Sequence, residues 1–76
     1  MKTFSVFDCV RGEYTGVRIQ AGYAVAACRR FIREKAMSAG IYWIEKSNVR
    51  NCAHVRSTYG ADFLLSPVKE ETNESA

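Results

Sequence analysis

One stretch of the sequence, residues 21–40, has the period of an amphipathic helix and constrains the fold more than any other feature. At about 3.6 residues per turn, its apolar side chains share a narrow arc, whereas its arginines fall on the other side. The arc contains Ala24, Cys28, Phe31 and Ile32, flanked by Val25 and Ala36, and the arginines are Arg29, Arg30 and Arg33. This helix needs a partner for its apolar side and leaves a basic side exposed.

The end of this helix is marked more clearly than its start. Residues 38–40, Ser-Ala-Gly, supply the glycine expected just past a helix C-terminus. Because no capping box precedes the helix, the sequence leaves its first turn undefined by a few residues. Lys35 lies on the apolar arc near the end, where its cation can meet the terminal carbonyl groups.

The segments on both sides of the helix have the alternating pattern of short strands. Before it, residues 2–10 and 14–21 flank a turn at residues 11–13 and predict a hairpin. After it, three more strands are predicted at residues 41–47, 52–59 and 63–68. Turns are predicted between them at residues 48–51 and 59–62. The first of these three is dense in aromatic residues, so we expect it to be central, and Pro67 suits an edge or a strand end.

The order of elements is therefore β-β-α-β-β-β. It predicts an α+β fold in which a single helix packs on one face of a mostly antiparallel sheet. With 76 residues, of which 47% are hydrophobic, the chain can build one core. We expect residues 1–68 to form a single domain and residues 69–76 to be an acidic, disordered tail.

The charge distribution points to an anionic partner. The net charge is +3, but residues 69–76 hold one lysine and three glutamates, so the rest carries +5. Its seven arginines favour forked hydrogen bonds to carboxylates or phosphates. This predicts a polyanion or an acidic protein surface as partner. The alternative is a solvated surface that keeps a small protein soluble.

The three cysteines, Cys9, Cys28 and Cys52, match neither a paired disulfide framework nor a metal knuckle. Reduced thiols indicate a cytoplasmic location. No apolar run approaches the roughly 20 residues of a membrane span, and no signal peptide is recognisable. We therefore expect no membrane association.

The sequence contains no recognisable catalytic constellation. His54 is the only histidine, and a pair with Cys52 or Cys28 would lack a third, orienting group. The carboxylates are scattered, and no phosphate-binding glycine loop is present. We therefore predict that the protein is not an enzyme and has neither a cofactor nor a metal site. Most of these carboxylates, Asp8, Glu13, Glu45 and Asp62, are expected in turns or on the surface.

A single helix cannot cover both faces of the sheet, so one face stays open. The alternation puts Arg18, Gln20, His54 and Arg56 there, with either Tyr42 and Lys46 or Trp43 and Glu45. This open face is solvated, forms a homodimer, or binds a partner. Arginines with an aromatic residue would suit nucleic acid, but the sequence motifs of RNA-recognition sheets, KH domains and helix-turn-helix proteins are absent.

The strand ending VRIQA at residue 21, the helix AVAACRRFIREKA and the strands from IYWIEKS to FLLSP resemble the layout of some phage-encoded anti-CRISPR proteins. The resemblance spans residues 2–68 and concerns size and element order, so no functional residue is carried over. It implies a small inhibitor without catalytic activity. Several members of this group lay a sheet face or basic side chains against a CRISPR effector and block its access to DNA.

Together, these observations predict a non-catalytic phage or mobile-element protein that binds a host protein or ribonucleoprotein complex, foremost a CRISPR effector. The alternative is a stand-alone DNA- or RNA-binding protein that contacts nucleic acid directly. The predicted partner-binding residues are Arg29, Arg30 and Arg33 on the helix, and Arg18, Lys46 and Arg56 on the open sheet.

Overall fold

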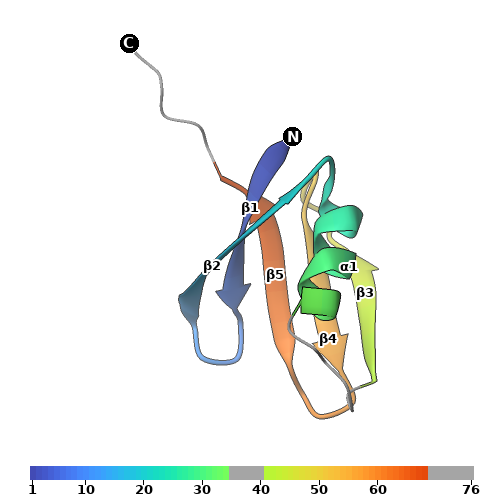
Figure 1. The fold of residues 1–76 in the computed structure, drawn as a ribbon. Coiled ribbons are helices and arrows are strands. Elements are labelled where there is room, and N and C mark those ends of the chain that lie inside the picture. Colours follow the sequence, from blue (N-terminus) through green and yellow to red (C-terminus); the bar gives the residue numbers. More distant parts are fainter. Residues whose placement is uncertain (35–40, 69–76) are drawn as a thin grey trace.

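The computed structural model describes residues 1–34 and 41–68, which form five strands and one helix in the predicted order. The elements are β1 (Lys2–Asp8), β2 (Glu13–Ala21), α1 (Ala24–Glu34), β3 (Tyr42–Lys46), β4 (Ala53–Ser57) and β5 (Asp62–Pro67). All strands join one sheet in the order β2-β1-β5-β4-β3, and every neighbouring pair is antiparallel. α1 packs across one face of this sheet (Figure 1). The predicted α+β fold is confirmed.

The apolar side of α1 forms one half of the core. Ala24, Cys28 and Phe31 are buried as predicted, Ile32 is partly buried, and Ala27 is buried in addition. The arginines of the helix are exposed, as the period of the sequence requires. The predicted roles of Lys35, Ala36 and residues 38–40 lie outside the described residues, as does the predicted tail at residues 69–76.

The sheet supplies the other half of the core through alternate residues of its strands. Phe31 of α1 meets Phe63 of β5 edge to face, with ring centroids 5.2 Å apart. Burying each large apolar side chain contributes about 1.5 to 3 kcal/mol. The fully buried or nearly buried residues from the strands are Phe4, Val6, Ile19, Ala21, Ala53, Val55 and Leu65.

The strand expected to be central is at the edge of the sheet. β3 pairs only with β4 among the described strands, whereas β5 lies between β1 and β4. The apolar density of β3 has another cause, because Tyr42 and Ile44 pack against the core while Trp43 covers the opposite face. Pro67 is the last residue of β5, in agreement with its predicted place at a strand end.

The strand register decides which residues of β3 reach the open face. Trp43 lies opposite Arg56, and Glu45 lies opposite His54. Lys46 lies opposite Ala53, which is fully buried beneath the helix. Because directly opposite residues share a face, Lys46 is on the helix side, and its predicted place on the open sheet is wrong.

The turn between β1 and β2 is held by the Asp8 carboxylate. Its Oδ1 accepts hydrogen bonds from the backbone of Val10 and Arg11, at 3.0 and 3.1 Å. Gly12 has a φ of 75°, which a residue without a Cβ adopts without strain. Cys9 follows directly in this turn, and its backbone N–H donates to the Asp62 carbonyl at 2.9 Å. The β1 register thus continues past Asp8 and brings Cys9 to the start of β5.

The first turn of α1 is capped by a residue that is distant in the sequence. The Asn51 side-chain oxygen, from the turn between β3 and β4, accepts a hydrogen bond from the Ala24 N–H at 3.1 Å. Asn51 has a φ of 58°, in the left-handed region where asparagine is better tolerated than most residues. Within the described residues, α1 is neither long nor apolar enough to cross a membrane.

Replacing Asn51 should destabilise the fold by an amount that depends on the substitute. We expect Asn51→Ala to lower the free energy of unfolding by about 2 kcal/mol, from the lost hydrogen bond and the cost of a positive φ. Asn51→Gly loses only the hydrogen bond and should cost about 1 kcal/mol. Urea denaturation followed by circular dichroism measures both. Equal losses would show that the positive φ contributes nothing.

Candidate functional site: two charged surfaces

The open face carries a continuous chain of polar contacts, here called the open-face network. Arg56 at its centre binds Glu45 through Nη1, at 2.7 Å, and approaches Asp62 Oδ1 with Nε at 3.4 Å. Trp43 Nε1 donates to the other Glu45 oxygen at 2.7 Å. His54 Nδ1 lies 2.8 Å from Asp62 Oδ1. The network thus joins five side chains from β3, β4 and β5.

Asp62 is the electrostatic centre of this network. Burial alone would raise the pKa of its carboxyl group, but the hydrogen bonds from His54 and Arg56 outweigh that effect and lower it below 3.8. The hydrogen bond between Arg56 and Asp62 also raises the pKa of the Arg56 guanidinium group, which is already high. Arg56 therefore has two internal anionic partners. This counts against its predicted role as a contact for an external anion, because such a contact would have to replace them.

A cysteine that the sequence did not associate with His54 lies beside it. Cys9 Sγ, a His54 ring nitrogen and an Asp62 oxygen all lie within 4.8 Å of one another. Neither cysteine considered from sequence belongs to this group: Cys52 stands outside it, and Cys28 is buried in the core, where burial raises its pKa to about 12. Sequence spacing could not reveal Cys9, because the strand pairing between β1 and β5 brings it there.

The Cys9 thiol is poorly suited to act as a nucleophile. Burial, reinforced by the Asp62 carboxylate, raises its pKa, although Arg56 opposes the change. A reactive cysteine needs the reverse, because the thiolate is the attacking species. Asp62 also contacts the Nδ1 atom of His54 and so resembles the orienting carboxylate of a triad.

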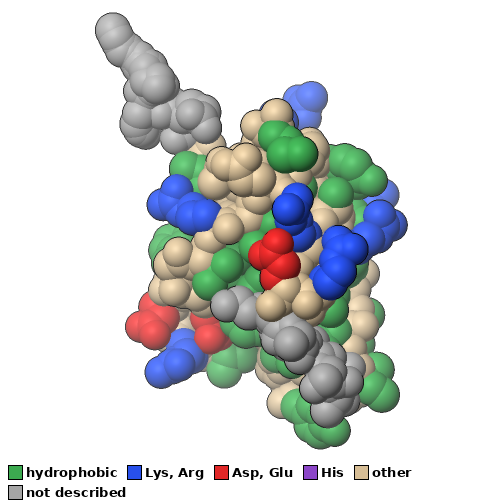
Figure 2. All heavy atoms as spheres, viewed as in Figure 1, with side chains coloured by type: hydrophobic (Ala, Val, Ile, Leu, Met, Phe, Trp, Pro, Cys, Tyr) green, Lys and Arg blue, Asp and Glu red, His purple; other side chains and the backbone are tan. Residues whose placement is uncertain are grey.

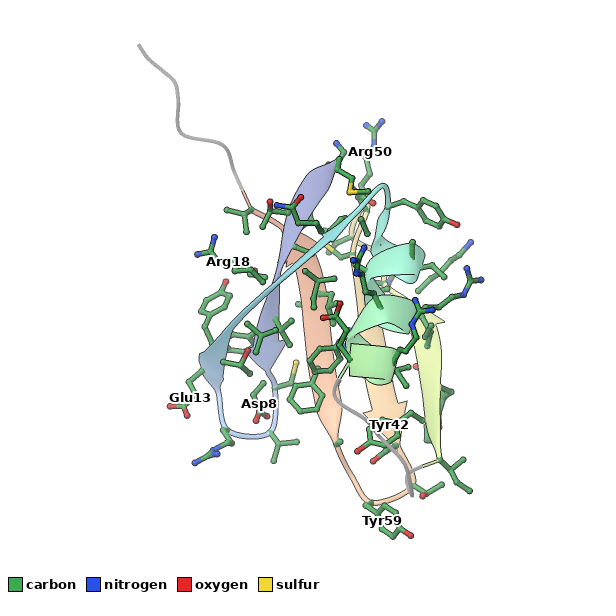
Figure 3. All side chains as sticks on the ribbon, viewed as in Figure 1. Asp8, Glu13, Arg18, Tyr42, Arg50 and Tyr59 are labelled. Atoms are coloured by element: carbon green, nitrogen blue, oxygen red, sulfur yellow. The ribbon has the colours of Figure 1, made fainter. Side chains whose placement is uncertain are left out.

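Two further arginines predicted to bind a partner, Arg30 on α1 and Arg18 on β2, differ in their surroundings. Arg30 is engaged within the protein: its Nε lies 3.0 Å from Glu34 Oε2, and its Nη1 donates to the Gln20 carbonyl at 3.2 Å. It therefore ties α1 to β2. Arg18 is exposed on β2 and points away from the helix (Figure 3). It lines a cleft of about 330 Å³ with residues of β1 and the end of β5.

The remaining predicted residues contribute to a second surface, the helix-side basic surface, formed by Arg29, Arg33, Lys46 and Arg50. All four are exposed, and within residues 1–34 and 41–68 none forms an ion pair. Figure 2 shows lysine and arginine side chains gathered over α1 and the neighbouring edge of the sheet. No carboxylate among the described residues pairs with these four side chains.

Arg50 is the member of this surface that the sequence analysis did not select. It lies in the turn between β3 and β4, at the end of the molecule where α1 begins (Figure 3). Together with Lys46 it lines a shallow cleft of about 280 Å³ beside Tyr23, Ala24 and Val25. A basic residue in a polar turn is a weak signal, and only the fold shows that this turn adjoins the helix.

No family model, no curated protein and no solved structure matches the chain.

The electrostatic role of Asp62 predicts a pH-dependent stability. A carboxyl group whose pKa is lowered in the folded state stabilises that state above 3.8, and the contribution is lost as pH falls through the folded pKa. Asp62→Asn should therefore lower the free energy of unfolding by about 1 kcal/mol at pH 7. The difference from the wild type should shrink below pH 3.8. Urea denaturation at several pH values measures it.

The matched control removes a carboxylate that lies outside the open-face network. Glu13 is exposed and forms only a 3.7 Å ion pair with Arg11, so Glu13→Gln should change stability little at any pH. If Asp62→Asn and Glu13→Gln gave the same pH profile, the assigned role of Asp62 would be incorrect.

Proposed function

We propose that this protein is a cytoplasmic, non-catalytic inhibitor that binds an anionic site on a host defence complex through its helix-side basic surface. A CRISPR effector is the leading target. The observation that carries the binding mode is the exposure of Arg29 and Arg33 on α1, of Lys46 on β3 and of Arg50 in the following turn, with no ion pair to any of them among the described residues.

The chemistry of this surface supports an anionic partner. Arginine offers forked, charge-assisted hydrogen bonds to carboxylates and phosphates, and both arginines lie on the exposed side of α1. Four positive charges that form no ion pair among the described residues raise the local potential and would steer an anion to this side. Three of the four residues lie on a helix and a strand packed on the core, namely Arg29, Arg33 and Lys46, so little backbone ordering is needed there on binding.

The contacts on the open face also favour the helix-side basic surface as the binding surface. Its central cation, Arg56, is neutralised by Glu45 and Asp62. The aromatic Trp43 is also engaged, through its indole N–H to Glu45. A platform for nucleic acid needs free cations. Among the described residues, the open face offers the exposed Arg18 without an ion pair, whereas the helix side offers four such cations, which favours the helix side as the binding surface.

The non-catalytic character is supported by the state of the cysteine nearest to a histidine. Burial and the Asp62 carboxylate raise the pKa of the Cys9 thiol, whereas a reactive cysteine needs a lowered pKa. The target class rests on a different argument, namely the resemblance of the order β-β-α-β-β-β and of the chain length to phage-encoded anti-CRISPR proteins.

Reversing the charge of Arg29 and Arg33 on α1 should strongly weaken binding. Tagged protein is used to capture complexes from the lysate of a bacterium with active CRISPR systems, and the complex retained by the wild type is identified and purified. We expect Arg29→Glu with Arg33→Glu to weaken affinity for that complex at least 100-fold, because two central charge-assisted contacts become repulsive. Surface plasmon resonance measures the affinity.

The control reverses two charges elsewhere. Lys2 and Arg11 are exposed and lie on β1 and in its turn, so Lys2→Glu with Arg11→Glu changes net charge equally and should retain binding. Equal losses in both double variants would contradict a specific helix surface. Retention that disappears with nuclease and falls linearly in a log-log plot against salt would instead identify a nucleic-acid-binding protein.

A further inference from the structure

Three side chains of different chemistry meet at one point of the open face, and none of the sequence motifs for metal binding includes them. Cys9 comes from the turn after β1, His54 from β4, and Asp62 from the start of β5. One ligand atom from each lies within 4.8 Å of the other two. Sulfur, imidazole nitrogen and carboxylate oxygen are the three ligand types that zinc accepts in proteins.

We propose that Cys9, His54 and Asp62 form a binding site for a zinc ion. The mixed set of donors excludes the hard cations, since calcium and magnesium select oxygen ligands and do not bind thiolates. Three protein ligands leave a fourth tetrahedral position for water or for a side chain of a partner. The site lies on the face opposite the helix, so it is separate from the helix-side basic surface.

The geometry requires only a small contraction. In a tetrahedral zinc site, bond lengths of roughly 2.0 to 2.3 Å place neighbouring ligand atoms about 3.3 to 3.6 Å apart. The three ligand atoms now lie within 4.8 Å of one another, so their largest separation has to shrink by about 1 Å when zinc binds. His54 Nδ1 and Asp62 Oδ1, now 2.8 Å apart, exchange their hydrogen bond for a shared ion and separate slightly. Side-chain rotation provides movements of this size.

The backbone around the site is fixed by strand pairing. The Cys9 N–H donates to the Asp62 carbonyl at 2.9 Å, and the pairing of β4 with β5 sets His54 opposite Leu64, two residues from Asp62. The side chains of His54 and Asp62 are 22% and 27% exposed, so an ion can enter from the open face. Preformed backbone positions of this kind lower the ordering cost of binding.

The charge balance is also favourable. On binding, the Cys9 thiol releases its proton to water and coordinates as a thiolate, so the ligands carry two negative charges against the two positive charges of zinc. Arg56 and Glu45 add one charge of each sign and cancel. Arg56 competes for Asp62 Oδ1, from which its Nε is 3.4 Å distant, and this competition reduces the affinity.

Cobalt(II) is a direct probe of the site, because a thiolate bound to cobalt gives a charge-transfer band in the near ultraviolet. Titrating the full chain with cobalt(II) should produce this band with one ion per protein, and zinc should remove it by displacement. Cys9→Ser should abolish the band. Asp62→Asn and His54→Gln should each weaken binding at least tenfold while retaining the fold by circular dichroism.

Cys52 provides the matched control, since it is partly exposed like Cys9 but stands outside the cluster. Cys52→Ser should leave the band and the affinity unchanged. The proposal is overturned if no band forms, if the band survives Cys9→Ser, or if it depends on Cys9 while His54→Gln and Asp62→Asn have no effect. The last result would mean that a lone thiol binds cobalt.

Discussion

An eleven-residue helix covers only one face of a five-stranded sheet, and the rest of this structure depends on that constraint. The covered face holds the core, in which the residues of α1 meet alternate residues of the strands. Because successive side chains of a strand point to opposite faces, the residues that flank a core residue along a strand point to the uncovered face. That face must satisfy its polar groups by itself or with a partner.

The charged groups of the open face and those on the outer side of the helix differ in their ion pairing. On the open face, Arg56 is held between Glu45 and Asp62, and His54 contacts Asp62, so the charges of the open-face network are satisfied within the protein. On the outer side of the helix, Arg29 and Arg33 form no ion pair with any described residue. Internal pairing leaves little charge for an anionic partner, whereas unpaired charge is available to one. The helix side is accordingly the proposed binding surface, and the open face the proposed metal site.

The central place of β5 is what assembles the open face. This strand pairs with β1 on one side and with β4 on the other. It therefore connects Cys9, which continues the register of β1, to His54 on β4, with Asp62 between them. An arrangement with β3 in the centre would separate these residues. The same turn chemistry that ends β1 at Asp8 also positions the cysteine.

The sequence by itself determined the element order, the fold class and the buried side of α1, because these follow from local periodicity and turn residues. It also determined that Arg29 and Arg33 face outward. Only the tertiary structure decided which strand is central, that Lys46 joins the helix side, and that Asn51 caps the helix at Ala24. It likewise decided that Cys9 meets His54. These features depend on strand pairing and register between segments far apart in the chain, for which periodicity along the chain carries no signal.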